Sequence, residues 1–304
     1  MPNKQRFRGV LVPVVTPFDQ ALRPDQQRFS RFCHHVLEEG ADGLAVFGTT
    51  SEANSVSGRE RMQLLDHLVD ADIPVTRLMP GTGACALNEA VDLTRHAVEL
   101  GCQGVLMLPP FYYKNVSDDG LFAFFSEVIQ RVGSEALQLY LYHIPQVSGV
   151  GLSPVLVERL VGEYPQTVAG LKDSAGDWNN TQTLLERGFD DFRVFAGSET
   201  FLLDTLRGGG AGCITATGSV HVRKIRQVYE HWQEEQADQL QADITRIRRI
   251  IEAYPVIPAL KRIIAYYLDD PEWQRTCPPL MPLDDQRAHE LIKRLEDEGF
   301  SWGA

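Results

Sequence analysis

Residues 138–171 read QLYLYHIPQVSGVGLSPVLVERLVGEYPQTVAGL, and this stretch contains the pattern that decides the fold. It begins with the largely apolar run Gln138–Tyr142 and ends with a second run, Val168–Leu171, while Pro154–Glu163 between them has helical spacing. Both runs are too short for helices, and they lack the polar alternation of a strand with one face in water. We therefore expect two buried parallel strands joined by a helix.

The same alternation extends in both directions along the chain. Eight apolar runs recur: Val10–Val15, Gly43–Phe47, Val75–Met79, Gly104–Leu108, Gln138–Tyr142, Val168–Leu171, Arg193–Ala196 and Gly212–Thr215. Eight strands, each followed by a helix, predict an α/β fold of the (β/α)₈ or TIM barrel type rather than an open sheet. A doubly wound sheet would carry a dinucleotide-binding fingerprint at its first turn, which here reads Thr16-Pro17-Phe18-Asp19.

Stretches with helical spacing lie between the runs and continue after the last one. Those between the runs include Asp25–Glu39, Asn88–Leu100, Pro154–Glu163 and Asn179–Arg187. Those after the last run are Arg223–Gln241, Asp243–Glu252, Ile257–Leu268 and Asp284–Glu298. Since a barrel needs only about 250 residues, we expect a barrel over residues 1–222. A helical extension over 223–304 would pack on it to form one structural unit.

Charge and cysteine content exclude several classes of protein. The formal net charge is -12, which disfavours nucleic acid or an anionic membrane as a partner because phosphates would be repelled. A small anionic substrate remains compatible with it. The five cysteines are scattered without a C-x-x-C pair, and the sequence shows neither a signal peptide nor a run of ~20 apolar residues. These features predict a cytoplasmic protein that binds no membrane.

Lys172 stands where the sixth run ends, in Gly170-Leu171-Lys172-Asp173-Ser174. A lysine at this point is often just the first solvated residue of a loop. Inside a barrel mouth its amine would be desolvated, which favours the neutral form that attacks carbonyls. Attack on a ketone gives an iminium, an electron sink for cleaving a C–C or C–O bond. Arginine could not take this role because it stays protonated.

The fifth run ends in Tyr140-Leu141-Tyr142-His143-Ile144-Pro145. Tyr140 is expected to pack in the core. Tyr142 lies where the chain leaves the barrel, so its hydroxyl could carry protons to and from a substrate. His143 is an alternative base, although a histidine beside a strand end is more often a hydrogen-bonded structural residue.

The second run is followed by Gly48-Thr49-Thr50-Ser51-Glu52. This loop could cap the next helix, or its hydroxyl and N–H groups could hold a carboxylate. The glycine clusters at 81–83 and 208–212 do not match a phosphate-binding fingerprint. No metal-ligand spacing is found, and Schiff-base chemistry requires neither a metal nor another cofactor.

Four motifs in order, at the ends of the second, fourth, fifth and sixth runs, resemble the dihydrodipicolinate synthase/N-acetylneuraminate lyase superfamily. They are Gly48–Glu52, Pro110-Phe111-Tyr112-Tyr113, Tyr142-His143-Ile144-Pro145 and Gly170-Leu171-Lys172-Asp173. The resemblance covers nearly the whole chain. It implies a (β/α)₈ barrel with a helical C-terminal extension, assembled as a homotetramer built from two dimers.

The resemblance also implies roles for individual residues. Lys172 would form the Schiff base, and Tyr142 would move protons. Thr49 and Thr50 would bind the carboxylate of the substrate, and Thr50 would link Tyr142 to Tyr112 of a neighbouring subunit. Further substrate-binding positions would be Ser51 in the carboxylate loop, Ser174 and Ser198 near the distal group, and the backbone carbonyls of Gly197 and Ile214.

Departures from the family pattern bear on the substrate. In the pattern of the dihydrodipicolinate synthases, an arginine grips the second substrate's carboxylate. Val147 stands at the position of that arginine. Gly58, Arg61 and Cys85 replace the expected polar ligands of the family's lysine-feedback site. Ser51 replaces the usual glycine of the G-T-T-G-E loop, here residues 48–52.

Other segments look closer to members that act on 4-hydroxy-2-oxoglutarate or 2-keto-3-deoxy sugar acids. They are Lys172–Asp177, Phe195–Ser198 and Ile257–Lys261. The prediction is a class I lyase that cleaves, condenses or dehydrates a substituted 2-oxo acid. One alternative is a dihydrodipicolinate synthase that joins pyruvate to aspartate semialdehyde. Another is a sensor that binds a keto acid without turnover.

Overall fold

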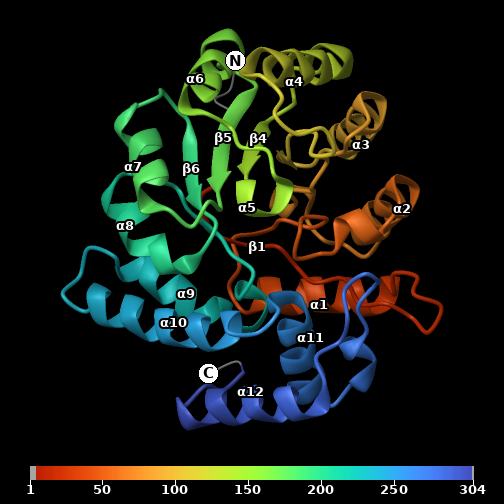
Figure 1. The fold of residues 1–304 in the computed structure, drawn as a ribbon, viewed down its shortest axis with the longest axis vertical. Helices are drawn as coiled ribbons and strands as arrows, with labels where there is room; N and C mark the ends of the chain where they lie inside the picture. Colours follow the sequence, from red (N-terminus) through yellow and green to blue (C-terminus); the bar gives the residue numbers. More distant parts are fainter. Residues whose placement is uncertain (1–4, 303–304) are drawn as a thin grey trace.

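The computed structural model describes residues 5–302, in which seven parallel strands form one sheet surrounded by helices (Figure 1). Met1–Lys4, part of the expected barrel and of the stretch inspected for a signal peptide, and Gly303–Ala304 lie outside the described residues. The strand order is β2-β1-β7-β6-β5-β4-β3. The strands are β1 (Gly9–Val12), β2 (Gly43–Leu44), β3 (Val105–Met107), β4 (Leu139–His143), β5 (Val168–Asp173), β6 (Arg193–Ala196) and β7 (Gly212–Ile214).

A segment without regular strand structure closes the sheet between β2 and β3. Isolated parallel bridges join Leu78 to Leu44 and Gly81 to Leu106. The Met79 N–H donates to the Leu44 carbonyl at 2.9 Å. Pro80, between the two bridges, has no N–H to donate, so a regular ladder cannot continue through it. The seven strands and this segment fill the eight positions of a barrel, and the predicted fold class is confirmed.

One of the eight expected strands was placed incorrectly, and a second is shorter than expected. Val75–Arg77 form a 3₁₀ helix, η2, so only the last residues of Val75–Met79 join the barrel wall. The run Gly43–Phe47 keeps only Gly43–Leu44 as a strand. Its last residue, Phe47, has φ of 60°, a left-handed conformation that ends extended backbone.

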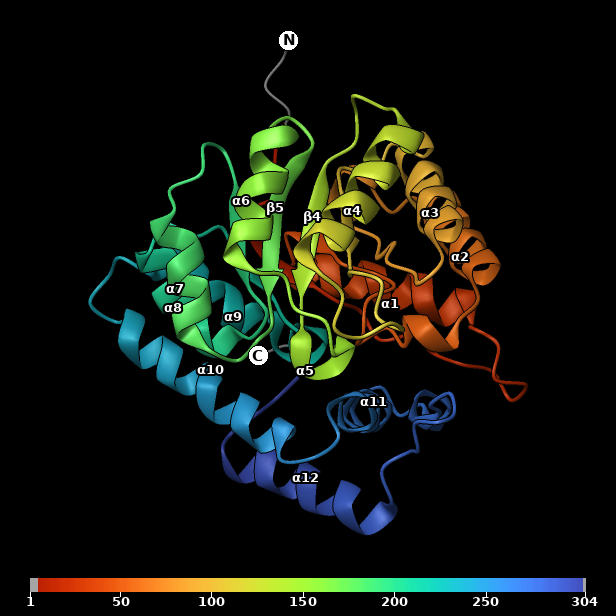
Figure 2. The same cartoon turned by 45° about the horizontal axis from the view of Figure 1, so that its top comes forward.

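Helices follow the strands. They are α1 (Gln26–Glu38), α2 (Gly58–Asp70), α3 (Leu87–Glu99), α4 (Asp118–Val132), α5 (Pro145–Ser148), α6 (Pro154–Glu163), α7 (Trp178–Glu186), α8 (Leu202–Arg207) and α9 (Gly218–His231). All but the short helix α5, which lies at the mouth, cover the outside of the barrel (Figure 2). Local sequence sets their ends: Ser57 and Glu60 form a capping box at the start of α2, and Gly133, with φ of 61°, ends α4.

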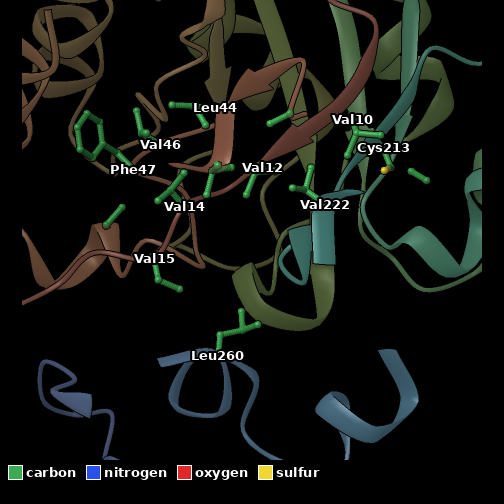
Figure 3. Close-up of a cluster of buried hydrophobic side chains, with 14 of the residues drawn as sticks. Val10, Val12, Val14, Val15, Leu44, Val46, Phe47, Cys213, Val222 and Leu260 are labelled. Carbon is green, nitrogen blue, oxygen red and sulfur yellow. The ribbon is translucent and has the colours of Figure 1, made fainter. Parts of the chain in front are cut away.

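The side chains of β1 show how the core is divided. Val10 and Val12 pack outward against the helices, in a cluster that includes Cys213 and Val222 (Figure 3). Leu11, between them, belongs to a second cluster with Tyr140 and other residues. Successive strand residues face opposite sides, so the two clusters are the helix-facing layer and the barrel interior. Tyr140 is fully buried, as expected of a packing residue.

The C-terminal helices lie across the end of the barrel to which the strands point (Figure 2). They are α10 (Ala237–Glu252), α11 (Val256–Tyr267) and α12 (Asp285–Asp297). The expected helix Arg223–Gln241 is in fact two helices, because α9 ends at His231 and α10 begins at Ala237. α9 packs on β1, whereas α10 crosses the mouth, so the chain must turn between them. Within residues 5–302, no helix combines the length and apolar character needed to cross a membrane.

Candidate active site

A cavity of about 580 Å³ opens at the carboxyl ends of the strands, on the side covered by the extension. Its walls come from barrel loops and from the extension together. The lining residues from the barrel include Thr49, Thr50, Tyr142, Val147, Lys172, Ser174, Gly197 and Ser198, and those from the extension include Arg248, Glu252 and Val256–Pro258. The place where parallel strands end is also where enzymes with this fold carry out their chemistry.

Lys172 lies near the end of β5, opposite Tyr142 of β4 in the strand register. Its side chain is 4% exposed, and its Nζ lies 4.2 Å from the centre of the Tyr142 ring. The neighbouring Asp173 carboxylate is turned away and accepts hydrogen bonds from Asn180 and Thr181. Among the described residues, no carboxylate forms an ion pair with Lys172. The strand alternation therefore sends the amine into the cavity and the carboxylate behind the wall.

Tyr142 has an altered acidity. Burial by itself would raise the pKa of Tyr142, but the nearby Lys172 charge and hydrogen bonds involving Thr49, Lys172 and Ser174 lower it below the ordinary tyrosine value. The Thr49 hydroxyl lies 3.5 Å from the Tyr142 hydroxyl. A tyrosine held in this way releases and accepts a proton more readily than a free one.

The loop 48–52 does not cap the following α-helix. That helix, α2, is capped by Ser57, and the short 3₁₀ helix η1 (Ala53–Ser55) has no side-chain cap. Thr49 and Thr50 both line the cavity. Of the two interpretations of this loop, the geometry favours the one in which its hydroxyls face a ligand.

Ser51 and Ile214 do not line the cavity. The Ser51 hydroxyl donates to the Val14 carbonyl at 2.5 Å, and its own carbonyl accepts from Thr16. Ile214 is fully buried in the cluster of the barrel interior. Ser51 therefore braces the loop 48–52 instead of facing the cavity, and the cavity wall near β7 is formed by Ala216.

Gly197 and Ser198 follow β6 and approach the loop after β5 closely. Any β-carbon on Gly197 would collide with the Ser174 hydroxyl and the Asp173 carbonyl, so only glycine fits there. The Ser198 hydroxyl lies 2.9 Å from that of Thr200. Ser174, Gly197 and Ser198 are thus brought together in the lining of the cavity.

Tyr112 lies outside this cavity. Its side chain is 74% exposed and packs edge-to-face on Tyr113, with ring centres 5.3 Å apart. Lys114 donates to the Phe111 and Ser148 carbonyls and so ties this loop to α5. Within one chain, Tyr112 is not brought together with Thr50 and Tyr142.

His143 is a structural residue. Its Nδ1 accepts a hydrogen bond from the Leu152 N–H at 2.9 Å. Burial lowers the pKa of His143, although the Asp173 carboxylate opposes this change. Its ring does not line the cavity, which leaves Tyr142 as the candidate proton carrier.

Sequence reasoning missed two charged residues of the cavity, Arg248 and Glu252 of α10. The Arg248 Nε donates to Glu252 at 3.0 Å, and its Nη1 donates to the fully buried Glu199 at 3.3 Å. In the sequence, Arg248 and Glu252 stand one helical turn apart. This spacing is typical of an exposed surface pair, and no local signal marks them as part of a site.

Glu52 and Lys261 form a fully buried ion pair between the loop 48–52 and α11. Glu52 also accepts a hydrogen bond from the Cys277 N–H at 2.8 Å, and Lys261 donates to the Arg275 carbonyl at 2.6 Å. Burial lowers the pKa of Lys261, and the Glu52 carboxylate opposes this. The pair fixes the extension onto the loop that carries Thr49 and Thr50.

The part of the chain that the structure describes contains no cluster of three or more His, Cys, Asp and Glu side chains that could hold a metal ion. The cavity instead combines an amine, a phenol and several hydroxyl groups. Such a set suits covalent chemistry on a carbonyl compound.

Comparison with known proteins agrees with this arrangement. The model of the dihydrodipicolinate synthetase family matches residues 6–298. The chain belongs to this family. An uncharacterized DapA-like lyase from Chloroflexus aurantiacus is 31% identical over 291 residues, which is 95% of this chain and 96% of that protein. Family members are class I lyases and aldolases, and this protein is an enzyme of that class.

Solved structures of family members superpose closely on this one. The dihydrodipicolinate synthase from Agrobacterium tumefaciens has a TM-score of 0.88 and 30% identity, and the match covers 95% of this chain and 98% of that one. A prophage protein of the family from E. coli K12, in complex with pyruvate, has a TM-score of 0.87 and 25% identity, covering 98% and 100%. The resemblance inferred from the four motifs is confirmed.

Proposed function

We propose that this protein is a lyase that forms a Schiff base between Lys172 and the ketone of a substituted 2-oxo acid. The observation that carries the proposal is the buried amine of Lys172, which lies 4.2 Å from the centre of the Tyr142 ring in the same cavity. Among the described residues, no carboxylate pairs with this amine. The complex of a family member with pyruvate supports it by analogy. The substrate that the sequence favours is 4-hydroxy-2-oxoglutarate or a 2-keto-3-deoxy sugar acid.

The reaction would proceed through covalent intermediates attached to Lys172. The Lys172 Nζ adds to C2 of the keto acid, and loss of water gives an iminium. When the C4 hydroxyl loses its proton, the C3–C4 bond breaks and its electron pair moves into the iminium, giving an enamine and releasing an aldehyde. Protonation at C3 and hydrolysis then release pyruvate and restore the amine. Loss of a C4 hydroxyl or condensation with an aldehyde would use the same intermediates.

Tyr142 would carry the protons in these steps. Its hydroxyl is held by Thr49 beside the amine, and its lowered pKa suits repeated release and uptake of a proton. Thr49 and Thr50, with the backbone N–H groups of their loop, would bind the substrate carboxylate. A preorganised set of donors at this point would also orient C2 towards the amine.

A homotetramer would complete the site. Tyr112 and Tyr113 are highly exposed aromatic side chains on a loop near α5, and such residues are common in subunit interfaces. In the proposed assembly, Tyr112 of a second copy would reach Thr50 and extend the proton path from Tyr142. The loop that Lys114 fixes to α5 would present this tyrosine to the neighbour.

Borohydride trapping tests the proposal directly. Pyruvate and borohydride should leave a reduced adduct on the peptide that contains Lys172, as seen by peptide mass mapping. The Lys172→Met variant should lose the adduct, whereas Lys293→Met, which removes an exposed lysine of α12, should keep it. An adduct that persists in Lys172→Met would contradict the assignment. Turnover of a 2-oxo acid panel, followed as pyruvate with lactate dehydrogenase, separates the enzyme from a sensor.

A further inference from the structure

The C-terminal extension contributes a charged pair to the part of the cavity away from the barrel loops. Arg248 and Glu252 of α10 line the same cavity as Lys172. Their side chains are 14% and 44% exposed, so the pair lies between the buried network below it and the open cavity. A keto acid longer than pyruvate would extend from Lys172 into this space.

The positive charge of Arg248 is more than balanced by carboxylates. Its Nε donates to Glu252 at 3.0 Å, and its Nη1 donates to Glu199 at 3.3 Å. Glu199 is fully buried and also accepts hydrogen bonds from Thr215 and Thr217. Two carboxylates thus face one guanidinium, which gives this region a local net negative charge. A second carboxylate on a substrate would be repelled there.

The unused atoms of the pair fit a hydroxyl group. Among residues 5–302, the Arg248 Nη2 and the Glu252 Oε1 have no hydrogen-bond partner. One is a donor and the other an acceptor, and a hydroxyl can satisfy both because it donates and accepts at once. A carboxylate only accepts, so it would leave the Glu252 oxygen unpaired and opposed by a like charge. The hydroxyls of Ser198 and Thr200 line the same cavity and add further neutral partners.

The described lining of the cavity offers no further cation that could bind a second carboxylate. Among the described lining residues, Lys172 and Arg248 are the only lysine or arginine side chains. Val147, which lines the mouth and is 62% exposed, offers an apolar surface and no charge. The second end of a dicarboxylate would therefore meet the Glu252 carboxylate and a guanidinium whose charge two glutamates already offset.

We propose that Arg248 and Glu252 form a specificity subsite that selects 2-oxo acids with a neutral, hydroxylated distal chain and rejects those with a second carboxylate. The inference rests on the proposed function, since it assumes that the substrate is attached at Lys172. It assigns the enzyme to 2-keto-3-deoxy sugar acids over 4-hydroxy-2-oxoglutarate. Both residues are specificity determinants and take no part in the covalent chemistry.

Relative kcat/KM values for two probes test the subsite. 2-Keto-3-deoxygluconate carries hydroxyls on its distal chain, whereas 4-hydroxy-2-oxoglutarate ends in a carboxylate. Consumption of each is followed by chromatography, with pyruvate release recorded alongside. The wild-type enzyme should have the higher kcat/KM with the sugar acid. In Glu252→Gln, the ratio of kcat/KM for the sugar acid to kcat/KM for the dicarboxylate should fall by roughly tenfold to a hundredfold, mainly through changes in KM. Glu290→Gln, an exposed change on α12, is the matched control and should leave the ratio unchanged.

Trapping with pyruvate separates the hypothesis of the specificity subsite from that of the Schiff base at Lys172. Pyruvate has no distal chain, so Glu252→Gln should be trapped by borohydride as efficiently as the wild type, which also shows that the variant is folded. A wild-type preference for the dicarboxylate, or an unchanged ratio in Glu252→Gln, would overturn the subsite while leaving the Schiff base intact. Absence of any adduct on the wild-type enzyme, with pyruvate or with either probe, would instead overturn the proposed function.

Discussion

Two buried lysines in this protein lie in similar surroundings and differ in one respect. Lys172 in the barrel mouth and Lys261 in α11 are 4% and 0% exposed, and their Nζ atoms lie 4.2 Å and 4.4 Å from the centres of the Tyr142 and Phe18 rings. Lys261 is paired with the Glu52 carboxylate and also donates to the Arg275 carbonyl. Lys172 has no described carboxylate partner and faces a cavity.

The difference separates a structural lysine from the one that we propose to be reactive. Removing one member of a buried ion pair leaves the other charge without compensation, so such a pair holds the fold together. A buried amine without a carboxylate contributes little of that kind, but it can attack a carbonyl that enters its cavity. The comparison thus predicts that matched substitutions at the two lysines will affect different properties.

The largest effect is expected on activity in Lys172→Met. Methionine keeps the length and apolar stem of lysine but cannot form an iminium, so turnover of any 2-oxo acid should fall by roughly a thousandfold or more. The free energy of unfolding should stay close to the wild-type value, because no partner charge is left unpaired. Coupled pyruvate release and denaturant unfolding measure the two quantities. Wild-type kinetics in this variant would remove Lys172 from the mechanism.

The matched variant Lys261→Met should lose stability. It strands the Glu52 carboxylate in the interior, which typically costs about 3–5 kcal/mol, and denaturant unfolding measures the loss. The double variant Lys261→Met with Glu52→Gln should recover part of it, because the buried charge is gone. Where either variant is folded, borohydride should still trap pyruvate on Lys172. Complete loss of trapping in a folded Lys261→Met enzyme would show that the division between the two lysines is wrong.

The sequence predicted the place of Lys172 in the cavity but not the ion pair of Lys261. Lys172, Tyr142 and Thr49 could be predicted because each stands at a strand end, where position along the chain fixes position in the barrel. Lys261 was noticed only within the Ile257–Lys261 motif, since its partner Glu52 lies more than two hundred residues away. Arg248 was missed because its four-residue spacing from Glu252 is typical of an exposed helical pair, and no local signal points to its buried partner Glu199.

The fold shows the same limit. Periodicity located six strands within a few residues, but it failed at Val75–Met79. There, Pro80 and a 3₁₀ turn interrupt the ladder, and the barrel is closed by isolated bridges that depend on the neighbouring strands. Periodicity also merged α9 with the start of α10, because the helical character of the residues on both sides does not reveal where the chain turns.

A smaller effect on kcat and on its pH dependence is expected from Thr49→Val. The Thr49 hydroxyl helps to lower the pKa of Tyr142, so its loss should raise that pKa. The alkaline limb of the kcat profile should then move to higher pH, and kcat near neutrality should fall roughly tenfold with the loss of one hydrogen bond. Thr49→Ser keeps the hydroxyl and should keep the wild-type profile. An unshifted limb in Thr49→Val would mean that Tyr142 does not govern it.

The smallest effect is expected from Val147→Arg, which changes the charge of the mouth without touching either lysine. Val147 lines the cavity but is 62% exposed, so solvent would screen much of the new charge. The KM for 4-hydroxy-2-oxoglutarate should fall a few-fold, because the new guanidinium would offer the second carboxylate a positive charge that no glutamate offsets, unlike that of Arg248. Trapping of pyruvate should be unchanged, since pyruvate has no second carboxylate. If the trapping of pyruvate and the binding of the dicarboxylate improved equally, the added cation would be acting on the Lys172 end of the cavity. The charge around Lys172 would then matter more than the absence of a carboxylate partner.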